Sequence, residues 1–248
     1  MRLALPSLNG FRRGSHYLEV AGAPPLPASA RGISMIDAKE FLKAGQQLHG
    51  HKCPAMPLGL RAGAAAMNAL AVARAKEKEL SIVLELGDDH CAHCFADGVQ
   101  MITGCTLGKG TIRKAGYGKF GVTLTEQATG RSVRVVPRAE AQLASRRTPY
   151  FLEYRAKGIP ASKVPDAVVD PVIEQVLSAP QEKLLSVGPE FRISVEQQPE
   201  TFATAVCPDC GELVIERYLR PDGDRMVCIP CLERRTQGAR VKQAQGVA

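Results

Sequence analysis

The sequence predicts a mixed domain of helices and strands followed by a small cysteine-rich module. Residues 58–75 are rich in alanine, which has the highest intrinsic helix propensity, and they predict a long helix. Residues 81–86 form an apolar run of strand length, and alternating apolar residues at 122–124 and 133–135 predict a hairpin. Two Cys-x-x-Cys pairs near the C-terminal end predict a metal-bound module.

The composition is that of a globular protein with one main domain and appendages. The chain has 248 residues, 45% of them hydrophobic and 23% charged, which suffices to bury a substantial core. The net charge of +7 comes from Lys and Arg residues that are spread along the chain. This distribution favours a solvated basic surface over a single binding site for an acidic partner. Tryptophan is absent and aromatic residues make up 5%, so neither a base-stacking surface nor a nucleic-acid partner is expected.

The cysteines indicate a compartment that keeps thiols reduced. Six of the eight form Cys-x-x-Cys pairs, a spacing that suits metal ligation better than a disulfide framework. The N-terminal residues lack the apolar segment of a secretion signal, and no stretch is apolar enough to cross a membrane. We therefore expect a cytoplasmic protein with no membrane partner.

The ordered chain is expected to begin near Ser34. Residues 1–33 are predicted to be a proline-rich extension, because their prolines cannot continue a helix or a central strand. Ser34 and Asp37 fit a helix N-terminal capping pair. The helix that follows would end at His49, and Gly50 suits a C-terminal position because glycine accepts positive φ at little cost.

Short helices and strands are predicted for the rest of the core. A helix over 95–103 follows the second group of cysteines and ends before Gly104. After the hairpin the chain alternates between helical segments and proline-containing connections, and a short strand leads out of the core. These elements are helices at 138–147, 150–157 and 166–178, and a strand at 191–195.

Two glycine-rich segments are similar to nucleotide-binding loops but lack the right context. Residues 104–110 have one residue too few for the phosphate loop and no Ser or Thr to bind magnesium. Residues 116–121 match the dinucleotide pattern but precede a predicted strand, where that fold requires a helix. We expect both to form turns; the alternative is a loop that holds an anion through backbone amides.

Imidazoles and thiols are concentrated in three short segments of the core. Such soft donors suit zinc or iron, as a single ion or an iron–sulfur cluster. Any one of them could instead be a buried thiol or a capping imidazole, but seven donors in three segments favour a metal site. The expected ligands are His51, Cys53, Cys94 and Cys105, with His49, Cys91 and His93 as alternates or additions.

Other polar residues are candidates for supporting roles. Cys53 precedes the alanine-rich helix, whose N-terminal partial positive charge favours a thiolate, so it is also the candidate catalytic nucleophile. Asp97 and Gln100 share one helical face and would either orient a metal ligand or remain surface polar groups. Lys109 would neutralise an anionic ligand or remain a solvated lysine.

The C-terminal module carries the most specific pattern. Its two pairs are separated by residues 211–227, a spacing that suits a tetrahedral zinc ion bound by four thiolates. Strands are expected over 213–219 and 226–227, followed by a short basic helix from Leu232, and residues 238–248 would form a tail. The predicted structural zinc ligands are Cys207, Cys210, Cys228 and Cys231.

Taken together, these segments resemble the FmdE-like family of formylmethanofuran dehydrogenase proteins in its long form. The resemblance implies an α+β core over 34–200, with helices packed on a mixed or antiparallel sheet, and a treble-clef zinc finger over 201–237. It also implies a metal site in the core and a homodimer. The matching stretches are residues 49–54, 58–63, 94–100 and 103–110, with the four-cysteine module.

Two classes of function are expected from these residues and this resemblance. The first is a metal-binding accessory or redox subunit of a larger complex, associated with molybdenum or tungsten one-carbon oxidoreductase chemistry of the formylmethanofuran dehydrogenase type. The second is a stand-alone enzyme that acts on a small molecule through an open metal position or the Cys53 thiolate. Nucleic-acid binding through the finger ranks last.

Overall fold

The structure is a computed structural model that describes residues 34–88, 90–195 and 200–245. The predicted extension over 1–33 and the last three residues of the predicted tail lie outside the described residues. The chain divides into two compact units, Met1–Val195 and Glu196–Ala248, which we call the core unit and the finger unit. No helix in the described part of the chain has the length and apolarity needed to span a bilayer.

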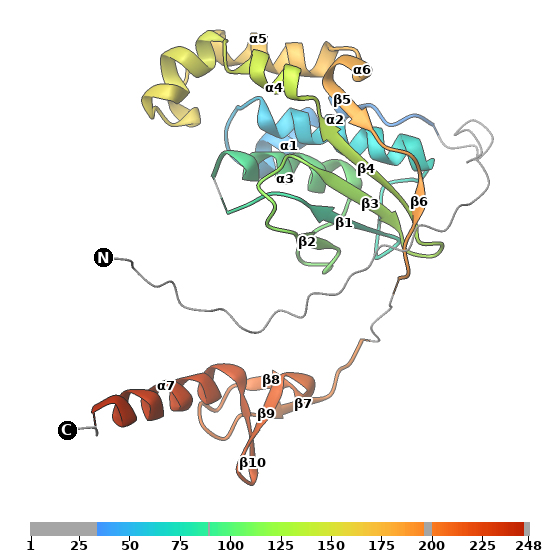
Figure 1. Cartoon of the computed structure of the whole chain (residues 1–248). Helices are drawn as coiled ribbons and strands as arrows, with labels where there is room; N and C mark the ends of the chain where they lie inside the picture. The colour runs from blue at the N-terminus through green and yellow to red at the C-terminus, as the bar shows by residue number, and fades with distance from the viewer. Residues whose placement is uncertain (1–33, 89, 196–199, 246–248) are drawn as a thin grey trace. The chain divides into compact units, whose positions relative to one another are not determined.

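A mixed sheet forms the centre of the core unit (Figure 1). Its strand order is β2-β1-β3-β4-β5, with β6 also paired to β4. The β1–β2 pair is parallel and the other pairs are antiparallel, so the expected α+β core on a mixed sheet is confirmed. The strands are β1 (Leu80–Leu84), β2 (Ile112–Lys114), β3 (Val122–Glu126), β4 (Arg131–Pro137), β5 (Leu185–Val187) and β6 (Phe191–Arg192).

The predicted hairpin is the β3–β4 pair. Leu124 lies opposite Val133, and Val122 lies opposite Val135. All four side chains are at most 1% exposed, as the alternation of apolar residues requires for a sheet with one face in the core. Gly130 closes the turn with a φ of 71°, a conformation that favours glycine.

The alanine-rich helix is α2 (Ala55–Leu70), which lies along the sheet beside β4 (Figure 1). It starts before the predicted boundary because proline is tolerated in the first turn, where its missing N–H has no intrahelical partner. It ends earlier because Ala71 adopts a left-handed conformation, φ 50°, and its N–H bonds back to the last turn. Its small side chains leave room for α3 (His90–Thr103) to pack against it.

The contact between α2 and α3 depends on glycines on both helices. A Cβ atom built on Gly59 would lie 2.0 Å from the Phe95 carbonyl oxygen, and one on Gly98 would lie 2.0 Å from the Met56 carbonyl oxygen. A Cβ atom on Gly63 would lie 2.3 Å from the Ile102 Cγ2, which is a side-chain atom. The two backbones therefore approach as closely as glycine allows, which no larger residue could permit without moving a helix.

The remaining helices of the core unit largely follow the predicted pattern. The segment predicted as a helix over 150–157 is a π-helical turn, η3, followed by a 3-10 turn, η4. The predicted strand at 191–195 is shorter in the structure. The helical elements are η2 (Ala38–Phe41), α1 (Leu42–His49), α4 (Ala139–Ser145), η3 (Tyr150–Tyr154), η4 (Arg155–Lys157), η5 (Ala161–Lys163), α5 (Asp166–Ser178) and α6 (Gln181–Leu184).

The finger unit consists of two hairpins and a helix. The segment predicted as one strand over 213–219 is divided by a 3-10 turn, so two separate strand pairs form, β7–β8 and β9–β10. The helix begins at Ile229 and therefore includes Cys231. The elements are β7 (Thr204–Val206), β8 (Leu213–Ile215), η6 (Glu216–Tyr218), β9 (Leu219–Asp222), β10 (Arg225–Cys228) and α7 (Ile229–Gln245).

Replacing Gly59 with alanine is expected to destabilise the core unit. The new methyl group would meet the backbone of Phe95, which cannot rotate away as a side chain can. Overpacking lowers the free energy of unfolding by about 1–3 kcal/mol, and the better helix propensity of alanine restores only about 1 kcal/mol of it. Urea unfolding followed by circular dichroism measures the loss.

Gly108→Ala is the matched control, because a Cβ atom at Gly108 meets nothing within 4 Å. Its unfolding midpoint should stay close to that of the unmodified chain. Equal midpoints for Gly59→Ala and Gly108→Ala would contradict the close approach of α2 and α3.

Candidate metal centre

The first part of the site is the connection between α1 and α2. Helix α1 ends at His49, and Gly50 follows in the left-handed conformation with φ 85°. Its N–H donates to the Gln46 carbonyl oxygen at 2.9 Å and closes the last turn of the helix. The chain then reverses, so that His51 and Cys53 return to the His49 side chain before α2 begins.

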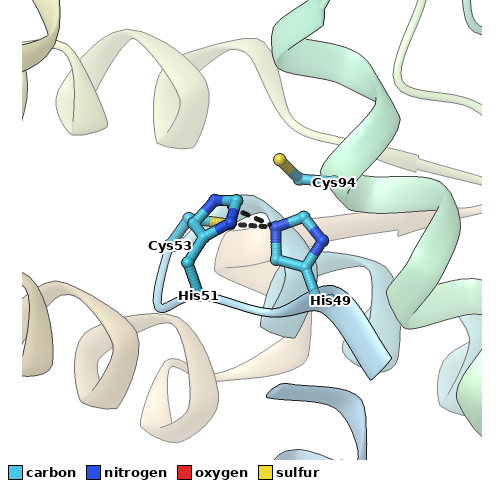
Figure 2. A group of neighbouring side chains, drawn as sticks. All are labelled: His49, His51, Cys53 and Cys94. Atoms are coloured by element: carbon cyan, nitrogen blue, oxygen red, sulfur yellow. Dashed lines mark hydrogen bonds between the residues drawn. The ribbon is translucent and has the colours of Figure 1, made fainter. Parts of the chain in front are cut away.

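Four side chains meet at this point (Figure 2). The Nε2 atoms of His49 and His51 are 3.1 Å apart, and the Cys53 Sγ lies 3.5 Å from the His49 Nε2. Cys94 approaches from α3, and the four ligand atoms all lie within 4.8 Å of one another. We call His49, His51, Cys53 and Cys94 the core cluster.

The spacing of these atoms fits a single tetrahedral ion. With bonds of about 2.0 Å to nitrogen and about 2.3 Å to sulfur, two ligand nitrogens lie about 3.3 Å apart and a nitrogen and a sulfur about 3.5 Å. The separations of 3.1 Å and 3.5 Å are close to these values. The residues therefore fit zinc or another borderline metal that accepts both imidazole and thiolate.

A carboxylate supports the cluster from behind. The His49 Nδ1 lies 2.7 Å from the Asp97 Oδ2, and the Gln100 amide donates to the other Asp97 oxygen at 3.3 Å. This contact fixes the imidazole so that Nε2 faces the other donors, as in the carboxylate–histidine–metal arrangement. Asp97 and Gln100 thus occupy the positions that the predicted orienting role requires.

The two thiols of the core cluster have pKa values shifted in opposite directions. A hydrogen bond from Cys94 lowers the pKa of Cys53 against the effect of burial, with help from the Met56 and Ala55 N–H groups at the start of α2. The same contact and burial raise the pKa of Cys94. Burial, then His49 and Arg155, lowers the pKa of His51 and favours a neutral, metal-binding imidazole.

The structure does not bring Cys105 to the core cluster. It was expected there because it and Cys94 flank one helix, but the nine helical positions from Cys94 to the end of α3 at Thr103 already correspond to about 14 Å along the axis. Cys105 is fully buried at the far end of α3, beside Thr103 and Thr111, and burial raises its pKa. Its environment is that of a buried core thiol.

Three further candidates are placed elsewhere or are not described. His93 is exposed and donates from Nε2 to the Gly87 carbonyl oxygen at 3.2 Å. The side chain of Cys91 lies outside the described residues. The Lys109 Nζ donates to the carbonyl oxygens of Gly104 at 2.8 Å and Ala75 at 3.3 Å, which holds two loops together and gives it no contact with the core cluster.

Two residues beside the cluster were missed by the sequence reasoning. Arg155 contributes to lowering the pKa of Cys53, and the pKa of Tyr150 is raised by burial and then by the charge of Cys53, although both residues come about a hundred positions later in the chain. Neither belongs to a ligand motif, and the segment that holds them was predicted as an ordinary helix. The only local signal was the tyrosine- and arginine-containing segment between Pro149 and Pro160.

The finger unit contains the second cluster. The ligand atoms of its four cysteines lie within 4.8 Å of one another, and the sulfurs of Cys210 and Cys228 are 3.8 Å apart. Two sulfurs on one tetrahedral zinc would be separated by about 3.8 Å. A hydrogen bond from the Cys228 N–H, 3.3 Å long, contributes most to lowering the pKa of Cys207 to about 6. The four-cysteine cluster therefore fits a zinc finger.

Replacing Cys210 and Cys228 together with serine should remove one metal equivalent from the full chain and unfold the finger unit. The reason is that its apolar cluster is small, so the metal must supply much of the folding free energy. Elemental analysis gives the metal content, and limited proteolysis shows whether residues 203–235 are cleaved first. An unchanged metal content would exclude the four-cysteine site.

Comparisons with known proteins agree with this architecture. The family model described as "FmdE, Molybdenum formylmethanofuran dehydrogenase operon" matches residues 48–186. A crystal structure of a tungsten formylmethanofuran dehydrogenase FmdE-like protein from Syntrophus aciditrophicus is similar with a TM-score of 0.54 and 19% identity, over 81% of this chain and 95% of that one. At 19% identity, the similarity between these two structures shows the fold of this chain and nothing beyond the fold.

A curated protein of Archaeoglobus fulgidus, named "Probable S-adenosyl-L-methionine-binding protein", is 30% identical over 222 residues. The match covers 83% of this chain and 54% of that protein, so the chain spans about half the length of this relative. The family model covers more than half of the chain and includes the core cluster, from His49 to Cys94. The chain therefore belongs to the FmdE family.

Proposed function

We propose that the chain is a metal-binding accessory or redox subunit that serves an oxidoreductase of the formylmethanofuran dehydrogenase type, in molybdenum- or tungsten-dependent one-carbon chemistry. The core cluster carries this proposal, because it combines two imidazoles and two thiols at the spacing of one metal ion. Membership of the FmdE family supports the association with such a system. A homodimer that docks on a larger complex is part of the proposal.

The composition of the core cluster favours a metal ion that is fully coordinated by protein over a catalytic ion with an open coordination position. Four protein donors fill a tetrahedral ion, as in sites that bind or transfer a metal or an electron, whereas catalytic zinc keeps a position for water. All four donor atoms lie within 4.8 Å of one another, which favours one ion over a two-iron cluster whose irons take separate ligands. We propose zinc or iron here and zinc in the finger.

A stand-alone enzyme is the alternative, and the environment of Cys53 favours it. Its pKa is lowered by the Cys94 hydrogen bond and by N–H groups at the start of α2, which is the setting of reactive cysteines. In that case the thiolate or the metal would act on a small molecule. S-adenosyl-L-methionine is the first such molecule to test, because the relative in Archaeoglobus fulgidus is named for binding it.

Cys53→Ala should remove the core metal while the finger unit keeps its own. Losing one of four ligands leaves an ion that three donors and solvent must hold, so the full chain should fall from two metal equivalents to one. Anaerobic purification, elemental analysis and absorption spectra measure this change. Cys105→Ala is the matched control, because it removes a buried thiol outside the core cluster; two equivalents in both variants would exclude the proposed site.

Asp97→Asn should weaken metal binding at the core cluster by about 10–100-fold, the usual effect of losing a carboxylate that orients a ligating histidine. The amide can accept the His49 hydrogen bond but does not raise the basicity of the imidazole as a carboxylate does. Competition with a chromophoric chelator gives the affinity. Asp88→Asn, an exposed carboxylate paired with Lys114, should leave the affinity unchanged, and equal effects of both substitutions would contradict the role of Asp97.

A further inference from the structure

The segment 51–53, which carries two donors of the core cluster, has few backbone contacts. The hydrogen bond of the Gly50 N–H closes α1 just before it. The next backbone bond runs from the Leu58 N–H to the Pro54 carbonyl oxygen at the start of α2. Among the described residues, none forms a backbone–backbone hydrogen bond with residues 51–53. The position of this segment, which we call the ligand segment, therefore depends on its side chains.

Lys52, the residue between the two donors, joins the ligand segment to α5. Its Nζ lies 2.9 Å from a carboxylate oxygen of Asp166 and 2.9 Å from one of Asp170. Asp166 is the first residue of α5, and Asp170 follows four residues later, so the two carboxylates lie on the same side of that helix. We call the two ion pairs of Lys52 with Asp166 and Asp170 the Lys52 bridge.

Helix α5 is a fixed support for this bridge. Its apolar side chains are buried in the core of the unit. At its C-terminal end the Arg61 guanidinium of α2 donates to three carbonyl oxygens at 2.5–3.1 Å, where a cation also interacts favourably with the helix dipole. These carbonyls belong to Val176, Leu177 and Ala179. Helix α5 is thus bonded to α2 at one end and to the ligand segment that precedes α2 at the other.

The charge of Lys52 and its position have opposite effects on a bound metal ion. A cation next to a metal site repels the metal, so the charge alone would weaken metal binding. Holding the ligand segment in the metal-binding conformation strengthens it, because the apparent affinity is reduced by the fraction of the metal-free chain that is not competent to bind. The direction in which the affinity changes when Lys52 is replaced therefore separates the two effects.

We propose that Lys52 is a positioning residue of the core cluster, whose bridge to Asp166 and Asp170 holds the ligand segment in the metal-binding conformation before the metal arrives. The inference rests on the proposed function, because it concerns the metal held at the core cluster. The carboxylates of the bridge are exposed, and such ion pairs contribute modestly and are screened by salt. The bridge therefore sets how tightly the four donors bind, and this contribution falls as the salt concentration rises.

Zinc binding by the full chain tests the bridge. The metal-free chain is titrated with Zn²⁺ in competition with a chromophoric chelator, whose absorbance gives the free zinc concentration. A short pulse of iodoacetamide at each point alkylates the thiols that are still free. Peptide mass mapping then assigns the bound zinc to the core cluster or to the finger unit, so the finger unit serves as an internal reference.

Lys52→Met should weaken zinc binding at the core cluster by about 2–10-fold, the value of two exposed ion pairs, and reduce its dependence on salt. Lys52→Arg keeps the charge and the ion pairs, so it should bind like the unmodified chain. Lys52→Glu should also weaken binding, although its charge alone would strengthen it. Adding Asp170→Lys to Lys52→Glu exchanges the two charges and should restore most of the affinity.

Lys39→Met is the matched control. Lys39 of η2 forms an exposed ion pair with Glu174 of α5 at 3.0 Å, but η2 carries no donor of the core cluster. Its core affinity should equal that of the unmodified chain. Equal weakening in Lys39→Met and Lys52→Met would assign the effect to a loosened α5 and exclude the positioning role. An affinity that is unchanged or higher in Lys52→Met would overturn the proposal, because only the charge of Lys52 would then act.

Alkylation of the metal-free chain separates failure of this inference from failure of the proposed function. Cys53 is only 3% exposed, so iodoacetamide reaches it when the ligand segment opens, whereas the buried Cys105 reports wider unfolding. Loss of a nearby cation by itself disfavours the thiolate, so faster alkylation of Cys53 relative to Cys105 in Lys52→Met reports opening. That result in a chain without core zinc would keep the bridge and lose the metal function. Without faster alkylation, such a chain would exclude both.

Discussion

The contact between α2 and α3 at backbone distance is the constraint on which the core unit depends. Gly59 and Gly98 let each helix touch a carbonyl oxygen of the other, so the two axes are fixed relative to one another. Cys53 directly precedes α2, and Cys94 lies on α3. The spacing of the donor atoms is therefore set by helix packing, and a small displacement of either helix would change the metal site directly.

The cluster also shows how one segment can combine several physical roles. Gly50 ends α1 and reverses the chain, so that two imidazoles separated by one residue face each other. A hydrogen bond from Cys94, together with the N-terminal N–H groups of α2, then favours a thiolate at Cys53. The positions of these ligands follow from local backbone geometry, whereas the protonation of Cys53 also depends on α3, which supplies Cys94 and, through Asp97, orients His49.

Local patterns determined what could be predicted from the sequence. The β3–β4 hairpin, helix α5 with its bounds of Asp166–Ser178 and the four-cysteine cluster all depend on residues close in sequence or on a strict spacing. The separation of Cys105 from Cys94 depends instead on the length of α3. The π-helical turn at Tyr150 could not be predicted either, because propensities do not distinguish it from an α-helix and tertiary packing selects it.

Three donors of the core cluster belong to one stretch of five residues, whereas Cys94 is 41 positions beyond Cys53. An ion bound by all four would act as a cross-link that closes this loop. By the chain-entropy relation used for disulfides, closing 41 residues removes about 4 kcal/mol of conformational freedom from the unfolded state. A bound ion would then slow the local opening of α3, and release of the ion would require α3 to open. Metal exchange and local opening of this helix would therefore have the same rate-limiting step.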